Sequence, residues 1–160
     1  MADVPIYVAV ITAAGVAVGA LISQVDASIR AHRAKLERRE RARTRTREAC
    51  LAVLSTADEL RTLAQNLPVY RGGADGMRGR VEEARRLAKA TRLHVADISM
   101  LVSKLIDPAD QVASAASDLA DDVARNVDPN TGMLTENPDV TKLVECIAVF
   151  RQEAVKQARD

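Results

Sequence analysis

The chain has 160 residues, of which 23 are basic and 22 acidic, so the formal net charge is only +1. This near-neutral balance hides a strong polarity, because residues 30–48 hold nine basic and three acidic side chains while residues 49–160 are net acidic. Two cysteines are too few for a disulfide framework, and the 112 residues from position 49 onward suffice for one small domain.

The first segment is an apolar run without any charged side chain, from Ile6 to Ile22. A bilayer core of about 30 Å requires roughly 20 helical residues, and residues 4–25 supply that length. A cleaved signal peptide would need a positively charged start, which Met1–Pro5 lacks. A buried core helix is the third interpretation, but such helices are usually shorter and keep a polar face. We therefore predict a transmembrane helix at 4–25, with residues 1–3 as an extracytoplasmic N-terminus.

The charges that flank this segment predict its orientation. The N-terminal flank has no Lys or Arg, whereas nine basic residues follow the span, and short positive flanks stay in the cytoplasm. We expect a single-pass protein of the inner or plasma membrane, with the N-terminus outside and the C-terminal domain in the cytoplasm. Small residues at four-residue spacing also predict a transmembrane dimer face, because they let two helices approach closely. This face consists of Gly15, Gly19 and Ser23.

Residues 26–48 are predicted to form a basic juxtamembrane helical stalk, since no Gly or Pro occurs between Ala20 and Leu67. We expect its basic side chains to contact anionic lipid headgroups. Nucleic-acid binding is the alternative; we favour it less because no aromatic side chain interleaves the run and three glutamates dilute it. The basic residues of the stalk are Arg30, Arg33, Lys35, Arg38, Arg39, Arg41, Arg43, Arg45 and Arg47.

Residues 49–160 are predicted to form an antiparallel bundle of the four-helix type, with helices over about 49–67, 77–106, 108–127 and 138–158. In each segment apolar residues recur at spacings of three and four, as in coiled coils, and short connections favour antiparallel neighbours. The predicted fold class is therefore all-α: one transmembrane helix, a helical stalk and a cytoplasmic bundle. The expected bundle seam is Cys50, Val53, Ala57, Leu60, Val81, Val95, Ile98, Val102, Leu105, Leu119, Leu143, Ile147 and Phe150.

The sequence offers no catalytic, cofactor-binding or metal-binding constellation. Neither His32 nor His94 has a Glu three residues before it, as di-iron bundles require, and no zinc spacing is present. Asp128-x-Asn130-x-Gly132 is reminiscent of part of a calcium loop, but Met133 stands where glycine is needed. We expect no cofactor, no metal and no enzymatic activity, with Cys50 and Cys146 as reduced thiols that pack near the core.

Two segments carry a weak likeness to known proteins. Residues 47–54 read REACLAVL and residues 146–155 read CIAVFRQEAV, behind an apolar N-terminus and an Arg-rich segment. In this order the chain resembles small, uncharacterised membrane-anchored helical proteins of high-GC actinobacteria. The resemblance implies a source and a matching architecture, and it implies no activity.

These features predict a non-enzymatic single-pass membrane protein whose bundle associates with a second copy, as a homodimer, or with an unidentified protein partner. The alternative is a membrane-surface regulatory protein, phage- or stress-related, that acts on anionic lipid through the Arg-rich stalk. An enzyme has the least support. Membrane lipid is an expected partner, and nucleic acid is not.

Overall fold

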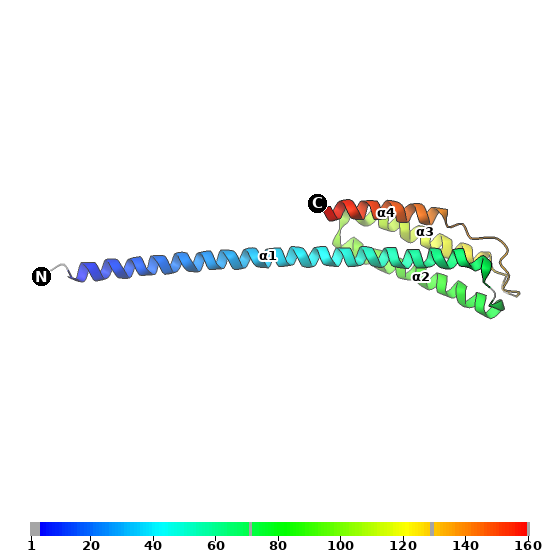
Figure 1. Cartoon of the computed structure of the whole chain (residues 1–160), viewed down its shortest axis with the longest axis horizontal. Helices are drawn as coiled ribbons and strands as arrows, with labels where there is room; N and C mark the ends of the chain where they lie inside the picture. The colour runs from blue at the N-terminus through cyan, green and yellow to red at the C-terminus, as the bar shows by residue number, and fades with distance from the viewer. Residues whose placement is uncertain (1–3, 71, 129, 160) are drawn as a thin grey trace. The chain divides into compact units, whose positions relative to one another are not determined.

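The computed structural model describes residues 4–70, 72–128 and 130–159, and within these ranges it leaves out the side chains of residues 4–22, 25 and 159. The described chain confirms the all-α prediction (Figure 1). Its α-helices are α1 (Val4–Asn66), α2 (Gly73–Leu101), α3 (Ile106–Arg125) and α4 (Thr141–Arg159), with 3-10 helices η1 (Leu67–Val69) and η2 (Ser103–Leu105). The chain divides into two compact units, 1–42 and 43–160, and α1 contributes residues to both.

The prediction of a membrane-spanning protein is corrected here. Among the residues that the structure describes, no helix is long and apolar enough to cross a membrane. The physical reason is the frequency of charge: from Asp26 onward α1 carries an ionisable side chain every few residues, and the remaining helices are similarly charged. The predicted single-pass topology and membrane localisation are therefore wrong on this finding. Most of the predicted span, residues 4–22, lies outside the residues with described side chains.

Unit 2 is a four-helix bundle made of the second part of α1 and of α2, α3 and α4, which lie side by side with alternating direction (Figure 1). A polar contact joins each neighbouring pair of helices and records their order around the bundle. These contacts are Thr91–Thr56 (α2–α1, 3.0 Å), Arg92–Ser117 (α2–α3, 3.1 Å), Lys142–Asp118 (α4–α3, 2.6 Å) and Arg151–Asp58 (α4–α1, 3.4 Å).

The bundle core is built mostly from small and aliphatic side chains. Phe150 is the only phenylalanine of the chain and is fully buried. Around it the buried set is rich in alanine, above all on α3, where Ala109, Ala113, Ala116 and Ala120 are each at most 5% exposed. Small side chains bury little area individually but allow helix axes to approach closely. The core therefore depends on short distances between helices.

The predicted helix over 77–106 is interrupted near its end. It begins earlier, at Gly73, and stops at Leu101, where Val102 takes an extended conformation with φ −144° and ψ 104°. The short helix η2 then turns the chain into α3, which starts at Ile106. Val102 is β-branched and leaves the helical region readily. The seam spacing continues through this break, so the hydrophobic pattern alone gave no sign of it.

The connection between α3 and α4 is an ordered turn. Val127 and Leu134 form an isolated antiparallel bridge, and the Asp128 carboxylate accepts the Asn130 N–H at 2.8 Å. Hydrogen bonds from the backbone N–H groups of Asn130 and Thr131 to this carboxylate lower the pKa of Asp128. Helix α4 begins at Thr141, later than the predicted position 138, and Asp139 Oδ1 accepts the Thr141 N–H at 2.9 Å as its cap.

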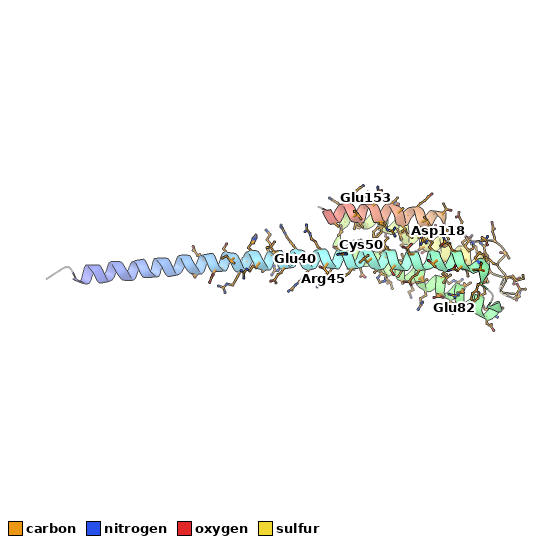
Figure 2. All side chains as sticks on the ribbon, in the orientation of Figure 1. Glu40, Arg45, Cys50, Glu82, Asp118 and Glu153 are labelled. Atoms are coloured by element: carbon orange, nitrogen blue, oxygen red, sulfur yellow. The ribbon has the colours of Figure 1, made fainter. Side chains whose placement is uncertain are left out.

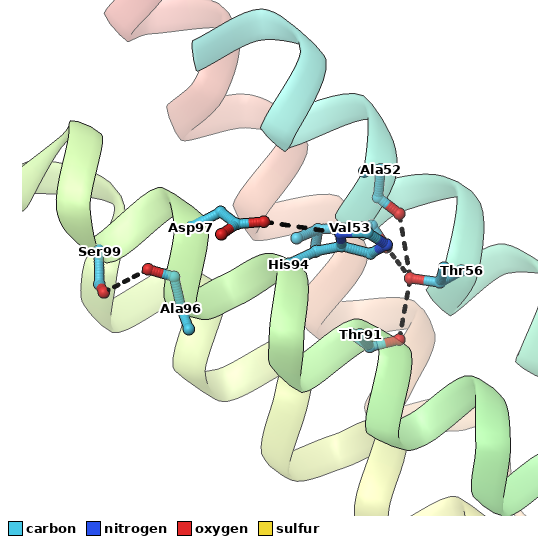
Figure 3. Close-up of polar contacts among 8 residues, drawn as sticks. All are labelled: Ala52, Val53, Thr56, Thr91, His94, Ala96, Asp97 and Ser99. Atoms are coloured by element: carbon cyan, nitrogen blue, oxygen red, sulfur yellow. Dashed lines mark hydrogen bonds and ion pairs between the residues drawn. The ribbon is translucent and has the colours of Figure 1, made fainter. Parts of the chain in front are cut away.

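Two threonines form the polar centre of the α1–α2 contact (Figure 3). Thr91 is fully buried, and its Oγ1 lies 2.9 Å from the Leu87 carbonyl oxygen and 3.0 Å from Thr56 Oγ1. Thr56 in turn donates to the Ala52 carbonyl oxygen at 3.0 Å. Each hydroxyl has a single proton, so Thr91 donates either to the Leu87 carbonyl oxygen or to Thr56 Oγ1, which accepts while its own proton goes to α1.

A double-mutant cycle at this pair should give a measurable coupling. We expect Thr56→Val and Thr91→Val each to destabilise the bundle mildly, and their coupling to be at most about 1 kcal/mol, the net contribution of one hydrogen bond. The coupling measures how much better the inter-helix bond is than the bond within one helix, because the hydroxyl left in each single variant can still donate to its own carbonyl. Chemical unfolding followed by circular dichroism measures it, and strictly additive effects would contradict the inter-helix bond.

Two glycines of unit 2 that differ in their surroundings give a second prediction. Gly132 has φ +64°, and a Cβ there would lie 2.9 Å from the Ala74 backbone nitrogen. We expect Gly132→Ala to destabilise unit 2 by about 2–4 kcal/mol, from the left-handed conformation and the overlap together. The matched control is Gly79→Ala, because Gly79 is helical, exposed and has open space around it.

The control substitution should raise stability by about 0.5–1 kcal/mol. Thermal unfolding of both variants checks the pair. Equal effects at positions 132 and 79 would show that the turn does not pack against the start of α2.

Candidate anion-binding surface

The Arg-rich segment is an uninterrupted part of α1, and its side chains are exposed. From Asp26 to Arg45 every described residue is exposed, and labelled side chains such as Glu40 and Arg45 project from the helix (Figure 2). Nothing described in unit 1 packs against this stretch. Its charges are therefore presented to solvent along the helix.

Charge is segregated around the helix in residues 26–42. At about 100° per residue, one half of the circumference carries basic side chains and no carboxylate. We call this half the basic face, and it consists of Arg30, Lys35, Arg38, Arg39 and Arg41.

The middle of the basic face, between its flanking cations, holds Arg38 and four alanines: Ala27, Ala31, Ala34 and Ala42. The other half of the helix holds the acidic residues Asp26, Glu37 and Glu40. It also holds Ile29 and Leu36, which are 44% and 45% exposed. The acidic side chains therefore lie off the basic face, and Glu37 reaches a cation at the edge of that face, Arg41.

Few of these cations are neutralised within the chain. Glu37 and Arg41 form the one ion pair found among the described residues of this segment, at 3.7 Å, with both side chains largely exposed. No carboxylate oxygen lies within 4.0 Å of Lys35, Arg38 or Arg39 in the described chain. An exposed pair contributes little energy, so even Arg41 stays available to an external anion.

A second group of exposed cations lies on α2, and it was not among the predicted site residues. Arg85 and Lys89 are exposed and have no carboxylate oxygen within 4.0 Å among described residues, whereas Arg78 pairs with Asp75 and Arg86 with Glu83. The clustering of basic residues between positions 77 and 92 is visible in the sequence. Which members stay unpaired depends on side-chain geometry, and so the sequence does not give it.

The other predicted site residues lie as follows. Ser23 is exposed, and Gly15 and Gly19 lie outside the residues with described side chains, so the proposed dimer face stays a prediction. Val81 and Val102 pack, partly buried, against the core. The remaining seam residues are each at most 8% exposed: Cys50, Val53, Ala57, Leu60, Val95, Ile98, Leu105, Leu119, Leu143, Ile147 and Phe150.

A groove of about 590 Å³ lies between α1 and α2, with Asp58, Glu59, Tyr70, Arg80 and Glu83 in its lining. Arg80 pairs with Glu83 at 3.1 Å and lies over the Tyr70 ring at 5.1 Å. Asp58 pairs instead with Arg61 and Arg151, which are not lining residues. Within the described residues no three His, Cys, Asp or Glu side chains gather as a metal site would require. In the lining the Ser55 hydroxyl donates to Glu59 Oε1 at 3.0 Å, an exposed contact one turn apart along α1.

The two thiols are separated by their burial. Cys50 is buried in the core and Cys146 is half-buried on α4. Burial raises the pKa of the Cys50 thiol. Burial also raises the pKa of Cys146, which nearby Lys142 partly offsets. Neither thiol is activated as a nucleophile.

No protein-family model, curated protein or solved structure matches this chain. The resemblance to actinobacterial proteins therefore stays a prediction.

Thiol labelling should follow this difference in exposure and pKa. At pH 8 we expect Cys146 to react with a maleimide well before Cys50, whose reaction requires opening of the bundle. Both rates should rise as pH increases toward and above 9, because raised pKa values leave little thiolate at neutral pH. Mass spectrometry of Cys50→Ser and Cys146→Ser variants assigns each rate. Faster reaction of Cys50 would contradict its burial.

Proposed function

We propose that this protein binds the phosphate backbone of duplex DNA through the basic face of α1. The observation that supports this proposal is the carboxylate-free half of the helix, on which five exposed cations lie among four alanines. The acidic residues that made nucleic acid an unfavoured partner in the sequence interpretation lie on the opposite half. Contact of the same cations with anionic lipid headgroups stays a prediction and is an arm of the test below.

The dimensions of an exposed helix suit this partner. A helix with its side chains is about 10–12 Å across, and the major groove of B-form DNA is about 12 Å wide. A helix in that groove has phosphates on both flanks. The basic face has cations on both flanks as well, with Arg30 and Arg41 on one side and Lys35 and Arg39 on the other.

The alanines determine how closely the helix can approach. Ala27, Ala31 and Ala34 lie in the middle of the basic face, so the first part of this stretch can approach the groove floor, whereas Arg38 projects from the same line further along the helix. Asn and Gln, which read adenine through bidentate hydrogen bonds, do not occur between residues 26 and 42. The expected binding is therefore electrostatic and nearly independent of base sequence.

Salt dependence gives the sharpest test of this proposal. If the five cations of the basic face contact phosphates, the logarithm of the binding constant should fall with the logarithm of salt concentration with a slope of about −4 to −5. Replacing Lys35, Arg38 and Arg39 by Gln should make that slope shallower by about three. Gln has a helix propensity similar to Lys and Arg, so α1 should persist. Fluorescence anisotropy on a labelled 20-base-pair duplex measures both values.

The matched control replaces Arg78, Arg86 and Arg125 by Gln, which removes the same charge from cations that pair locally on the bundle. This control should keep the full slope. An equal loss in both triple variants would show a general charge effect and contradict a basic face. Tighter binding to polyglutamate or to anionic lipid vesicles than to duplex DNA, with the same loss on Gln substitution, would assign these cations to another partner.

A further inference from the structure

One exposed side of α2 combines unpaired cations with large apolar side chains. We call it the α2 outer face, and it consists of Arg85, Lys89, Arg92, Leu93 and Met100. The spacings of four, three, one and seven residues place these side chains on the same side of the helix. At about 1.5 Å per residue the face is roughly 22 Å long.

The cations of this face lack acidic partners. Arg85 and Lys89 make no ion pair in the described chain, and Arg92 donates to Ser117 Oγ on α3 at 3.1 Å rather than to a carboxylate. Elsewhere on α2 the cations are neutralised, as Arg80 is by Glu83. Glu82 lies on the same side of α2 and is exposed, but it forms no ion pair in the described chain, so the three cations of the outer face outnumber it and stay available to an external group.

The apolar part of the face is unusually exposed. Leu93 is 60% and Met100 is 83% exposed, and Ala96 lies exposed between them. Methionine fills irregular contacts readily and is common on protein-binding surfaces. Neighbouring large apolar side chains in water typically mark an interaction site.

A groove of about 290 Å³ runs beside the cationic part of the face, between α2 and α3. Arg85, Lys89 and Arg92 form its α2 side, and Ser117 and Asp121 form its α3 side. The groove gives a shallow seat in which a row of side chains from a partner could lie against the cations. Asp121 is the acidic group of this lining, and three cations outnumber it.

We propose that the α2 outer face docks an acidic amphipathic helix of a partner protein. Such a helix would carry Asp or Glu along one part of one side, for Arg85, Lys89 and Arg92, and Leu or Ile along the rest, for Leu93 and Met100. The combination of charge and apolar surface selects this occupant. DNA would leave Leu93 and Met100 uncovered.

A second copy of the chain fits the face poorly. Its most acidic helix is α3, whose aspartates Asp110, Asp118 and Asp121 are exposed while its valines and leucine are buried in the core. The acidic half of α1 does set Asp26, Glu37 and Glu40 beside the exposed Ile29 and Leu36, but Arg33 lies among these carboxylates and would face the cations of α2. The proposal therefore commits to a heterologous segment.

The test presents the full-length protein with a displayed library of 20-residue helical peptides that differ in charge and apolar pattern on one side. We expect retained clones to be enriched in the acidic-then-apolar arrangement. Arg85→Gln with Lys89→Gln, and separately Leu93→Ser with Met100→Ser, should each weaken a retained peptide about tenfold. Isothermal calorimetry on two retained clones measures this change.

Matched controls remove equal charge and equal apolar surface from other exposed positions. These are Arg78→Gln with Arg86→Gln, and Val69→Ser with Met133→Ser, at residues 71% and 69% exposed; both should keep full affinity. The proposal is overturned if no clone is retained, if retained clones lack acidic residues, or if the outer-face variants bind as well as the controls.

Two further outcomes would assign the face to another occupant. Self-association of the chain that disappears in Leu93→Ser with Met100→Ser would indicate a second copy. Loss of duplex-DNA affinity in Arg85→Gln with Lys89→Gln, without loss of peptide affinity, would indicate nucleic acid. Because the α1 basic face is intact in these variants, its DNA binding and this docking can fail separately.

Discussion

Close approach of helices through alanine is the constraint on which the bundle depends. A core with a single phenylalanine and no tryptophan cannot gain its stability from a few large side chains. Instead alanines on three helices, such as Ala57, Ala84 and Ala116, are fully buried at the contacts. Each contributes little burial, so many short-range contacts must form together. A larger side chain at any of these positions would force two helices apart.

The same short distances explain the polar details of unit 2. The Thr56 and Thr91 hydroxyls lie 3.0 Å apart across the α1–α2 contact. The α3–α4 connection must lie directly against the first turn of α2, and Gly132 occupies the point where no Cβ fits beside Ala74. These are consequences of one packing mode. They are also the places where an otherwise permissive, aliphatic bundle acquires a unique register.

The sequence predicted the helical class and the buried stripes because apolar spacing depends on helix geometry alone. It misplaced the end of α2 and the start of α4, where Val102 and Asp139 act through local backbone conformation and capping. The prediction of a membrane protein rested on the hydropathy of residues 4–25. It is not supported, because no helix among the described residues is long and apolar enough to cross a membrane. The candidate surfaces were only partly predictable. Counting charges identified the Arg-rich run. The separation of basic and acidic side chains on opposite halves of α1, and the lack of ion pairs at Arg85 and Lys89 on α2, depend on where the fold places each side chain.

The two cationic surfaces differ in a way that bears on what each can recognise. On the α1 basic face the cations lie beside alanines. A bound anion therefore contacts positive charge but covers no large apolar side chain. The α2 outer face sets Arg85 and Lys89 beside Leu93 and Met100, so an occupant gains from desolvating apolar surface as well as from charge. Salt screens the first kind of contact more completely than the second, since burial of apolar surface does not depend on ionic attraction. A near-neutral net charge is thus compatible with two basic surfaces of different selectivity, because recognition depends on which charges the fold leaves unpaired and on what lies beside them.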